Sequence, residues 1–131
     1  MKLLLDTHIW LWTLGVPGQL RPRVQAVIER STNELWLSPL SVWEVLLLAG
    51  KGRISLIPTA QEWLAVALTK VPAKEAPLTA EVVLATRQID LTHRDPVDLF
   101  LAATARVFDL TLVTADERLI HGKGFSILAN R

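Results

Sequence analysis

Short, largely apolar runs constrain the fold of this chain more than any other feature. Strands are expected at residues 2–5, 35–37, 110–113 and 125–128, and stretches with helical spacing separate them. Runs of this length are typical of strands in a parallel sheet, because helices cover both of its faces. We therefore predict an α/β sandwich with a mainly parallel central sheet flanked by helices.

Helix-start signals support this alternation. Ser38 and Pro39 form a cap and a first-turn proline, and they predict a helix that runs to Gly50. Asp95 and Pro96 repeat the pattern. Further helices are expected over residues 8–14, from Pro22, over 59–69, from Thr79 through Ile89, and after Asp116, with residues 72–78 as a connector.

Composition narrows the class of protein. A chain of 131 residues that is 50% hydrophobic suits one domain, over residues 1–131. The absence of cysteine excludes disulfides, thiolate zinc sites, iron–sulfur clusters and cysteine nucleophiles. Asp6 and His8 interrupt the apolar start, which argues against a signal peptide, and no apolar run is long enough for a bilayer. We expect a soluble, cytoplasmic protein without a membrane partner.

Two of the expected strands are followed by aspartate, at Asp6 and Asp116. Ligands of an open parallel sheet bind outside the carboxyl ends of its strands, so the two side chains would converge there if the strands are neighbours. Converging carboxylates repel one another unless a cation neutralises them, and oxygen ligands select Mg²⁺ or Mn²⁺. Glu44 and Asp98, on two expected helices, complete a set suited to phosphodiester hydrolysis.

Each acid also has a structural alternative. Asp6, Asp95 and Asp116 could cap helices, Asp98 could favour a helix dipole, and Glu44 could lie on a solvent-facing stripe. The metal hypothesis therefore depends on all four acids together. The spacing of His8, His93 and His121 matches no zinc motif, and we interpret them as surface groups or neighbours of the site. The tryptophans, at positions 10, 12, 36, 43 and 63, are expected mostly in the core. Alternatively, Trp10 or Trp12 is exposed and contacts a partner.

Other phosphate chemistries fit less well. The lysines flanked by glycine, Lys51 and Lys123, lack the glycine spacing of a phosphate-binding loop. A receiver-like domain needs an acidic pair after its first strand, and a haloacid-dehalogenase-like phosphatase needs Asp-x-Asp there. This chain has Asp6-Thr7-His8.

The acidic motifs, taken in order, resemble the PIN-domain family. They are Leu4-Leu5-Asp6-Thr7-His8, the isolated Glu44, Arg94-Asp95-Pro96-Val97-Asp98 with the following Ala102-Ala103-Thr104-Ala105, and Leu112-Val113-Thr114-Ala115-Asp116. Within that family, the chain length and these motifs are similar to VapC-type toxins of prokaryotic toxin–antitoxin pairs. The resemblance spans nearly the whole chain.

The resemblance implies a PIN-like α/β/α sandwich and a metal-dependent endoribonuclease. Asp6, Glu44, Asp98 and Asp116 would form the catalytic acidic site that holds Mg²⁺ or Mn²⁺. Thr7, Asp95 and Thr114 would support it. Many relatives carry arginine where this chain has Leu99, which places an arginine contact to substrate or antitoxin in question.

The implied partners are an RNA substrate, a cognate antitoxin protein and a second copy of the chain. A net charge of +1 is a weak electrostatic footprint for RNA, so cations at the rim would have to guide the backbone. Arg21, Arg23, Lys51 and Arg53 are the candidates. The alternative function is a non-catalytic PIN-like binding module.

Overall fold

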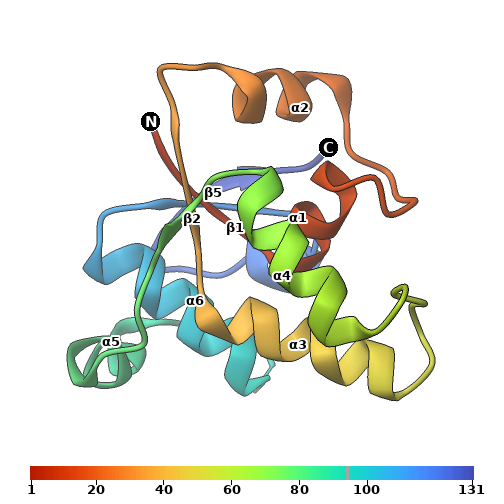
Figure 1. Cartoon of the computed structure of the whole chain (residues 1–131). Helices are drawn as coiled ribbons and strands as arrows, with labels where there is room; N and C mark the ends of the chain where they lie inside the picture. The colour runs from red at the N-terminus through yellow and green to blue at the C-terminus, as the bar shows by residue number, and fades with distance from the viewer. Residues whose placement is uncertain (94) are drawn as a thin grey trace.

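A central sheet of five parallel strands organises the molecule (Figure 1). The computed structural model describes residues 1–93 and 95–131, so Arg94 of the predicted motif lies outside the described residues. The strands are β1 (Lys2–Leu5), β2 (Glu34–Leu37), β3 (Lys74–Glu75), β4 (Thr111–Thr114) and β5 (Ser126–Ala129). Their order is β3-β2-β1-β4-β5, and every pair is parallel, which confirms the predicted sheet.

Helices fill the connections between the strands. They are α1 (Thr7–Thr13), α2 (Pro22–Glu29), α3 (Pro39–Gly50), α4 (Ala60–Lys70), α5 (Ala80–Ala85), α6 (Pro96–Val107) and α7 (Glu117–Ile120), with one 3-10 turn, η1 (Thr86–Gln88). The predicted cap of α3 is confirmed, because the Ser38 hydroxyl accepts the Leu40 N–H at 3.1 Å. Among the described residues, none of the helices combines the length and the hydropathy that spanning a bilayer requires.

Two predicted segments differ in the structure. The connector over residues 72–78 contains β3, whose two side chains are exposed and carry no apolar pattern; its pairing with β2 defines it. The helix expected from Thr79 through Ile89 ends at Ala85 and tightens into η1. The backbone of Asp90 exchanges two hydrogen bonds with that of Lys123, of 2.9 and 3.0 Å. These bonds take the place of helical hydrogen bonds at Asp90.

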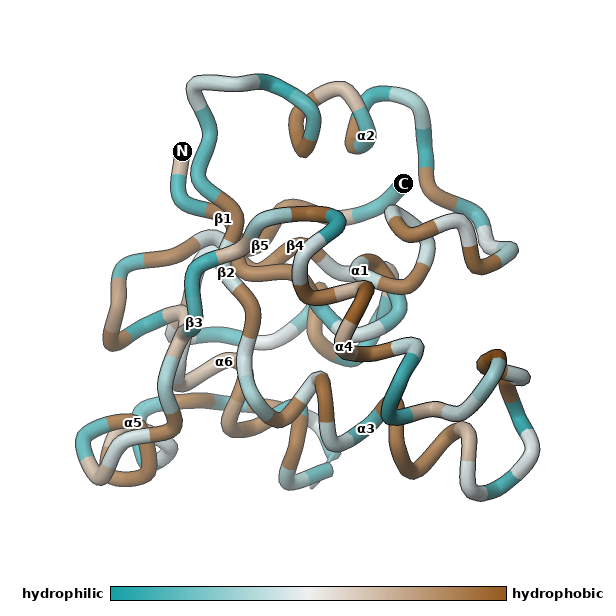
Figure 2. Tube along the Cα trace, viewed as in Figure 1, coloured by the Kyte–Doolittle hydropathy of each residue, from teal (hydrophilic) through white to brown (hydrophobic). Residues whose placement is uncertain are grey.

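Strand β1 is buried on both of its faces. Leu3 and Leu5 face the core layer that includes residues of α1 to α4, and Leu4 faces the layer built mainly on α6. All three leucines are fully buried. The result is a three-layer α/β/α sandwich, and the hydropathy of the trace follows it, with apolar residues concentrated on the central strands (Figure 2).

The register between β1 and β4 positions the candidate site. Leu5 pairs with Val113, so the next residues, Asp6 and Thr114, lie side by side at the carboxyl edge of the sheet. The N–H of Asp6 still donates to the Val113 carbonyl at 3.0 Å. The first acid of the predicted set therefore directly follows a fully buried strand segment.

Candidate active site

Asp6 is held from two sides where β1 ends. Its Oδ1 accepts the Thr7 N–H at 2.8 Å, and its Oδ2 accepts the hydroxyl of the fully buried Thr114 at 2.7 Å. Asp6 itself is only 9% exposed. Burial raises the pKa of this carboxyl, and its two hydrogen bonds oppose the shift without cancelling it. Asp6 is thus both the cap of α1 and a buried carboxylate at the sheet edge.

Glu44 reaches the same place from α3. Its Oε1 accepts a hydrogen bond from the Thr7 hydroxyl, and the N–H of the same Thr7 donates to Asp6. Burial raises the pKa of Glu44 to about 7, and repulsion from Asp6, Asp98 and Asp95 adds to the effect. The solvent-facing alternative for Glu44 is therefore wrong.

Asp98 lies in the first turn of α6 and is 7% exposed. Its Oδ2 lies 2.8 Å from Nε2 of His93. Burial raises the pKa of Asp98 to about 6 despite this contact, and the charges of Asp6, Asp95 and Asp116 raise it further. Asp98 is therefore a buried acid in a field of other acids, and more than a partner of the helix dipole.

Asp116 caps α7 and pairs with an arginine of that helix. Its Oδ1 accepts the Arg118 N–H at 2.9 Å, and the Arg118 Nε and Nη2 lie 3.3 and 3.1 Å from its two carboxylate oxygens. Burial favours a higher pKa for Asp116, but the hydrogen bonds from Arg118 outweigh it and the pKa is lowered. Thr114 adds a further link, since its hydroxyl accepts the Asp116 N–H at 3.0 Å.

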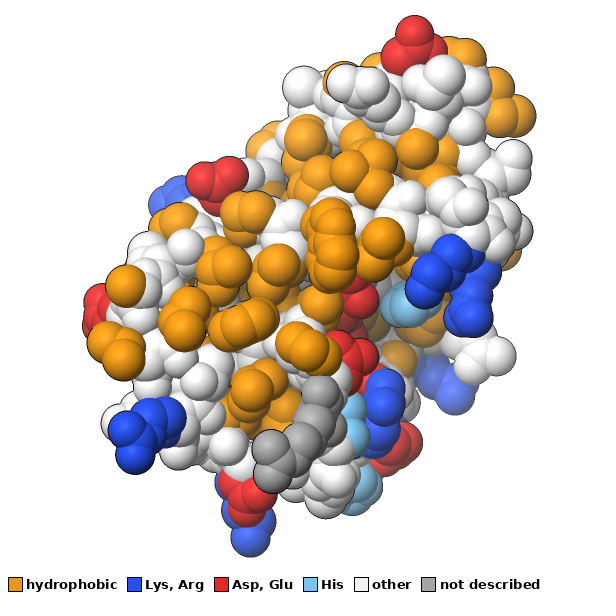
Figure 3. All heavy atoms as spheres, turned by 90° about the horizontal axis from the view of Figure 1, so that it is seen from below, with side chains coloured by type: hydrophobic (Ala, Val, Ile, Leu, Met, Phe, Trp, Pro, Cys, Tyr) orange, Lys and Arg blue, Asp and Glu red, His pale blue; other side chains and the backbone are white. Residues whose placement is uncertain are grey.

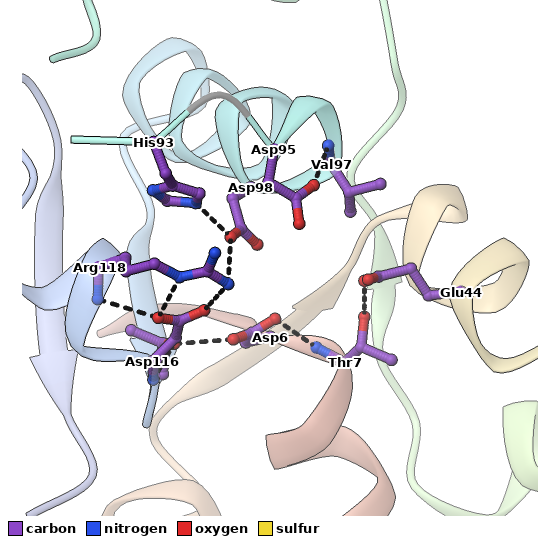
Figure 4. Close-up of polar contacts among 10 residues, drawn as sticks. Asp6, Thr7, Glu44, His93, Asp95, Val97, Asp98, Asp116 and Arg118 are labelled. Carbon is purple, nitrogen blue, oxygen red and sulfur yellow. Dashed lines mark hydrogen bonds and ion pairs between the residues drawn. The ribbon is translucent and has the colours of Figure 1, made fainter. Parts of the chain in front are cut away.

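The structure brings all four predicted acids to one place, with Thr7 and Asp95 beside them (Figure 4). Thr114 lies beside them as well, because its hydroxyl donates to Asp6. They come from the ends of β1 and β4 and from α3 and α6. Asp95 caps α6 by accepting the Val97 N–H at 3.0 Å, as predicted.

The predicted basic residues are not part of this cluster. In the ranges described, Arg21, Arg23, Lys51 and Arg53 make no ion pair or side-chain hydrogen bond with the acids. Arg23 instead donates to the carbonyls of Ala129 and Arg131 at 2.9 and 3.0 Å, so it stabilises the C-terminal segment. Its expected contact with RNA stays a prediction.

No role for Arg118 was expected from the sequence, and His93 was interpreted as a surface group or a neighbour of the site. The structure makes His93 a neighbour of Asp98, with its side chain 13% exposed. Arg118 Nη2 lies 3.9 Å from Asp98 Oδ2 as well as contacting Asp116. Its position two residues after Asp116, in the expected short helix, is the sequence feature that could have indicated a contact with the acids.

The donor set fits a divalent cation. It offers carboxylate oxygens, which Mg²⁺ and Mn²⁺ prefer. Burial is the main cause of the raised pKa values of Glu44 and Asp98, and a cation would offset the repulsion between acids that adds to it. Over the described parts of the chain, no three acidic or histidine side chains are already spaced to hold one ion. Binding therefore requires these side chains to adjust, and the contacts of Asp98 and Asp116 with His93 and Arg118 are those that would change.

Replacing Asp95 with alanine tests its structural role. We expect the free energy of unfolding to fall by about 1 kcal/mol, because α6 loses its cap. Urea unfolding measures this, and Asp95→Ser, which keeps a capping oxygen, should lie closer to the wild type. If the acids cleave RNA, as the resemblance implies, cleavage should fall less than in Asp98→Ala. Equal losses of cleavage in the two alanine variants, with folding unchanged, would show that Asp95 acts in the site itself.

The raised pKa values predict how stability depends on pH when a chelator is present. The pKa of Glu44 rises from 4.5 to about 7 and that of Asp98 from 3.8 to about 6, so the folded state binds protons more tightly than the unfolded state. The free energy of unfolding should fall as the pH rises from about 4.5 to about 7. The lowered pKa of Asp116 acts below this window. Urea unfolding at several pH values measures the slope, and a rise through the window would contradict the assigned burial.

Comparison with known proteins places this fold in a family. The PIN domain model matches residues 3–124. No significant match was found among curated protein sequences.

Solved structures share the fold over nearly the full length. A chain of VapBC2 from Rickettsia felis, bound to a DNA fragment from its promoter, superposes with a TM-score of 0.71 at 16% identity, covering 98% of both chains. DNA-bound VapBC from Salmonella typhimurium superposes with a TM-score of 0.67 at 20% identity, again over 98% of each chain. VapBC-5 from Mycobacterium tuberculosis, a member of the VapBC family of toxin–antitoxin systems, gives 0.62 at 16% identity over 99% of this chain and 98% of that one.

At these identities the solved structures establish the common fold, and the family model covers nearly all of the sequence. The chain belongs to the PIN domain family.

Proposed function

We propose that the protein is a divalent-metal-dependent endoribonuclease that acts as the toxin of a toxin–antitoxin pair. One observation carries the proposal: four carboxylates from separate elements of a PIN domain meet at the carboxyl edge of the sheet (Figure 4). Three of them, Asp6, Glu44 and Asp98, have pKa values raised by burial and by the charges of their neighbours. Such a set is costly to maintain unless it serves to bind a cation.

Asp6, Glu44, Asp98 and Asp116 are the residues that would hold Mg²⁺ or Mn²⁺. A bound ion would supply activation of a water and stabilisation of negative charge on the scissile phosphate. The Thr114 hydroxyl fixes one oxygen of Asp6, and the Thr7 hydroxyl fixes Glu44. We expect these two threonines to orient the acids before substrate arrives.

The partners we propose are RNA, a cognate antitoxin chain and a second copy of the protein, in the cytoplasm. The toxin–antitoxin complexes among the structural neighbours support the antitoxin. Exposed apolar residues support a protein partner: Trp43, Leu46 and Leu47 on α3 are between 39% and 49% exposed. Figure 3 shows many apolar side chains on the lower face, with acidic side chains gathered among them beside basic and histidine groups.

Cleavage of end-labelled total RNA by the purified protein tests the proposal. We expect discrete fragments with Mg²⁺ or Mn²⁺ and none with a chelator. Binding of Mn²⁺ without cleavage of any RNA would contradict the proposed substrate. A protein that neither binds Mn²⁺ nor cleaves RNA would instead be the non-catalytic PIN-like module.

A further inference from the structure

Arg118 contacts two acids of the cluster, and the sequence alone assigned it no role there. Its guanidinium contacts both carboxylate oxygens of Asp116 through Nε and Nη2. The same Nη2 lies 3.9 Å from Oδ2 of Asp98, which belongs to a different helix. Arg118 therefore lies between two carboxylates that would otherwise repel each other (Figure 4).

We propose that Arg118 is the internal counter-ion of the acid cluster and sets its affinity for divalent metal, because a metal ion must displace the guanidinium from Asp98 and Asp116. The inference rests on the proposed metal site. Arg118 and a divalent ion seek the same carboxylate oxygens, and two cations cannot share them without mutual repulsion.

A local role in α7 does not account for all the contacts. The helix has only four residues, and the Asp116 carboxylate already caps it by accepting the backbone N–H of Arg118. That backbone contact needs no guanidinium. The approach to Asp98 joins α7 to α6 and serves no cap.

The exposure of the side chain makes displacement feasible. The Arg118 side chain is 54% exposed, whereas those of Asp98 and Asp116 are 10% and 28% exposed. An exposed guanidinium can move into water at little cost in free energy, while the acids stay in place. Arg118 therefore weakens metal binding without blocking it.

The test is calorimetric titration of Mn²⁺ into the full-length protein after chelator treatment. Arg118→Gln removes the charge and keeps the backbone cap, and we expect it to bind Mn²⁺ roughly tenfold more tightly than the wild type. Arg118→Lys keeps a positive charge but lacks the planar fork, and should lie between the two. Circular dichroism establishes that both variants are folded.

Arg131→Gln is the matched control. It also removes one arginine charge, but the partner of Arg131 is Glu117, at 2.8 Å, outside the acid cluster. Its affinity for Mn²⁺ should stay within about twofold of the wild type, as expected for a screened surface charge.

The outcomes separate the two proposals. Failure of the wild type and of Arg118→Gln to bind Mn²⁺ would overturn the proposed metal site. Binding by the wild type with equal or weaker affinity in Arg118→Gln would overturn the counter-ion role alone. Equal tightening in Arg118→Gln and Arg131→Gln would also overturn it, because the effect would then be one of overall charge.

Discussion

Asp98→Asn is expected to lose RNA cleavage by at least roughly a thousandfold. The substitution keeps the volume of the side chain but removes a charge that would hold the metal, and metal ions supply several kcal/mol of charge stabilisation in such reactions. Folding should be preserved. Because burial raises the pKa of Asp98 to about 6, the neutral amide should leave the protein at least as stable as the wild type at neutral pH when a chelator is present.

Asp109→Asn is the matched control for this prediction. Asp109 is exposed, lies between α6 and β4, and has a φ of 53°, a left-handed conformation that asparagine tolerates. Its cleavage rate should equal that of the wild type. Wild-type activity in Asp98→Asn would remove this residue from the assigned site, and a loss in both variants would show a general effect of charge.

The largest expected effect on stability is that of Trp10→Ala. Trp10 is 1% exposed and belongs to the core layer that joins the sheet to α1 and α4. Removing a buried tryptophan should lower the free energy of unfolding by about 3–5 kcal/mol, through lost burial and the cavity that it leaves. Urea unfolding measures the change.

Trp43→Ala provides the comparison within the same residue type. Trp43 lies on α3 and is 49% exposed, so its removal should cost less than about 1 kcal/mol. An equal fall in the free energy of unfolding for Trp10→Ala and Trp43→Ala would show that the face around Trp43 is covered in solution, as a partner surface would be.

Local patterns predicted most of the fold because they act over a few residues. The apolar runs predicted β1, β2, β4 and β5, and Ser38 and Asp95 predicted the starts of α3 and α6. Strand β3 was missed because its identity depends on backbone pairing with β2. The tryptophans were expected mostly in the core: Trp10 is buried, those at 12, 36 and 63 are partly buried against the core, and Trp43 is exposed. Trp43 differs because α3 is apolar on more than one face, and the sequence alone does not say which face meets the sheet.

The candidate site was also predicted only in part from local patterns. Asp6 and Asp116 were accessible to prediction because strand ends define one edge of a parallel sheet. The contact between Thr7 and Glu44 depends on how α1 and α3 pack, and the ion pair of Arg118 with Asp98 depends on how α6 and α7 meet. Such pairings between separate helices leave no periodic signal in the sequence.

Anomalous diffraction from crystals soaked in Mn²⁺ tests whether the four acids hold a metal, because it locates the ion without assuming an activity. We expect a manganese peak bounded by carboxylate oxygens of Asp6, Glu44, Asp98 and Asp116, with the Arg118 guanidinium moved away from Asp98 and Asp116. A peak elsewhere, or no peak at a Mn²⁺ concentration that supports RNA cleavage, would contradict the proposed metal site.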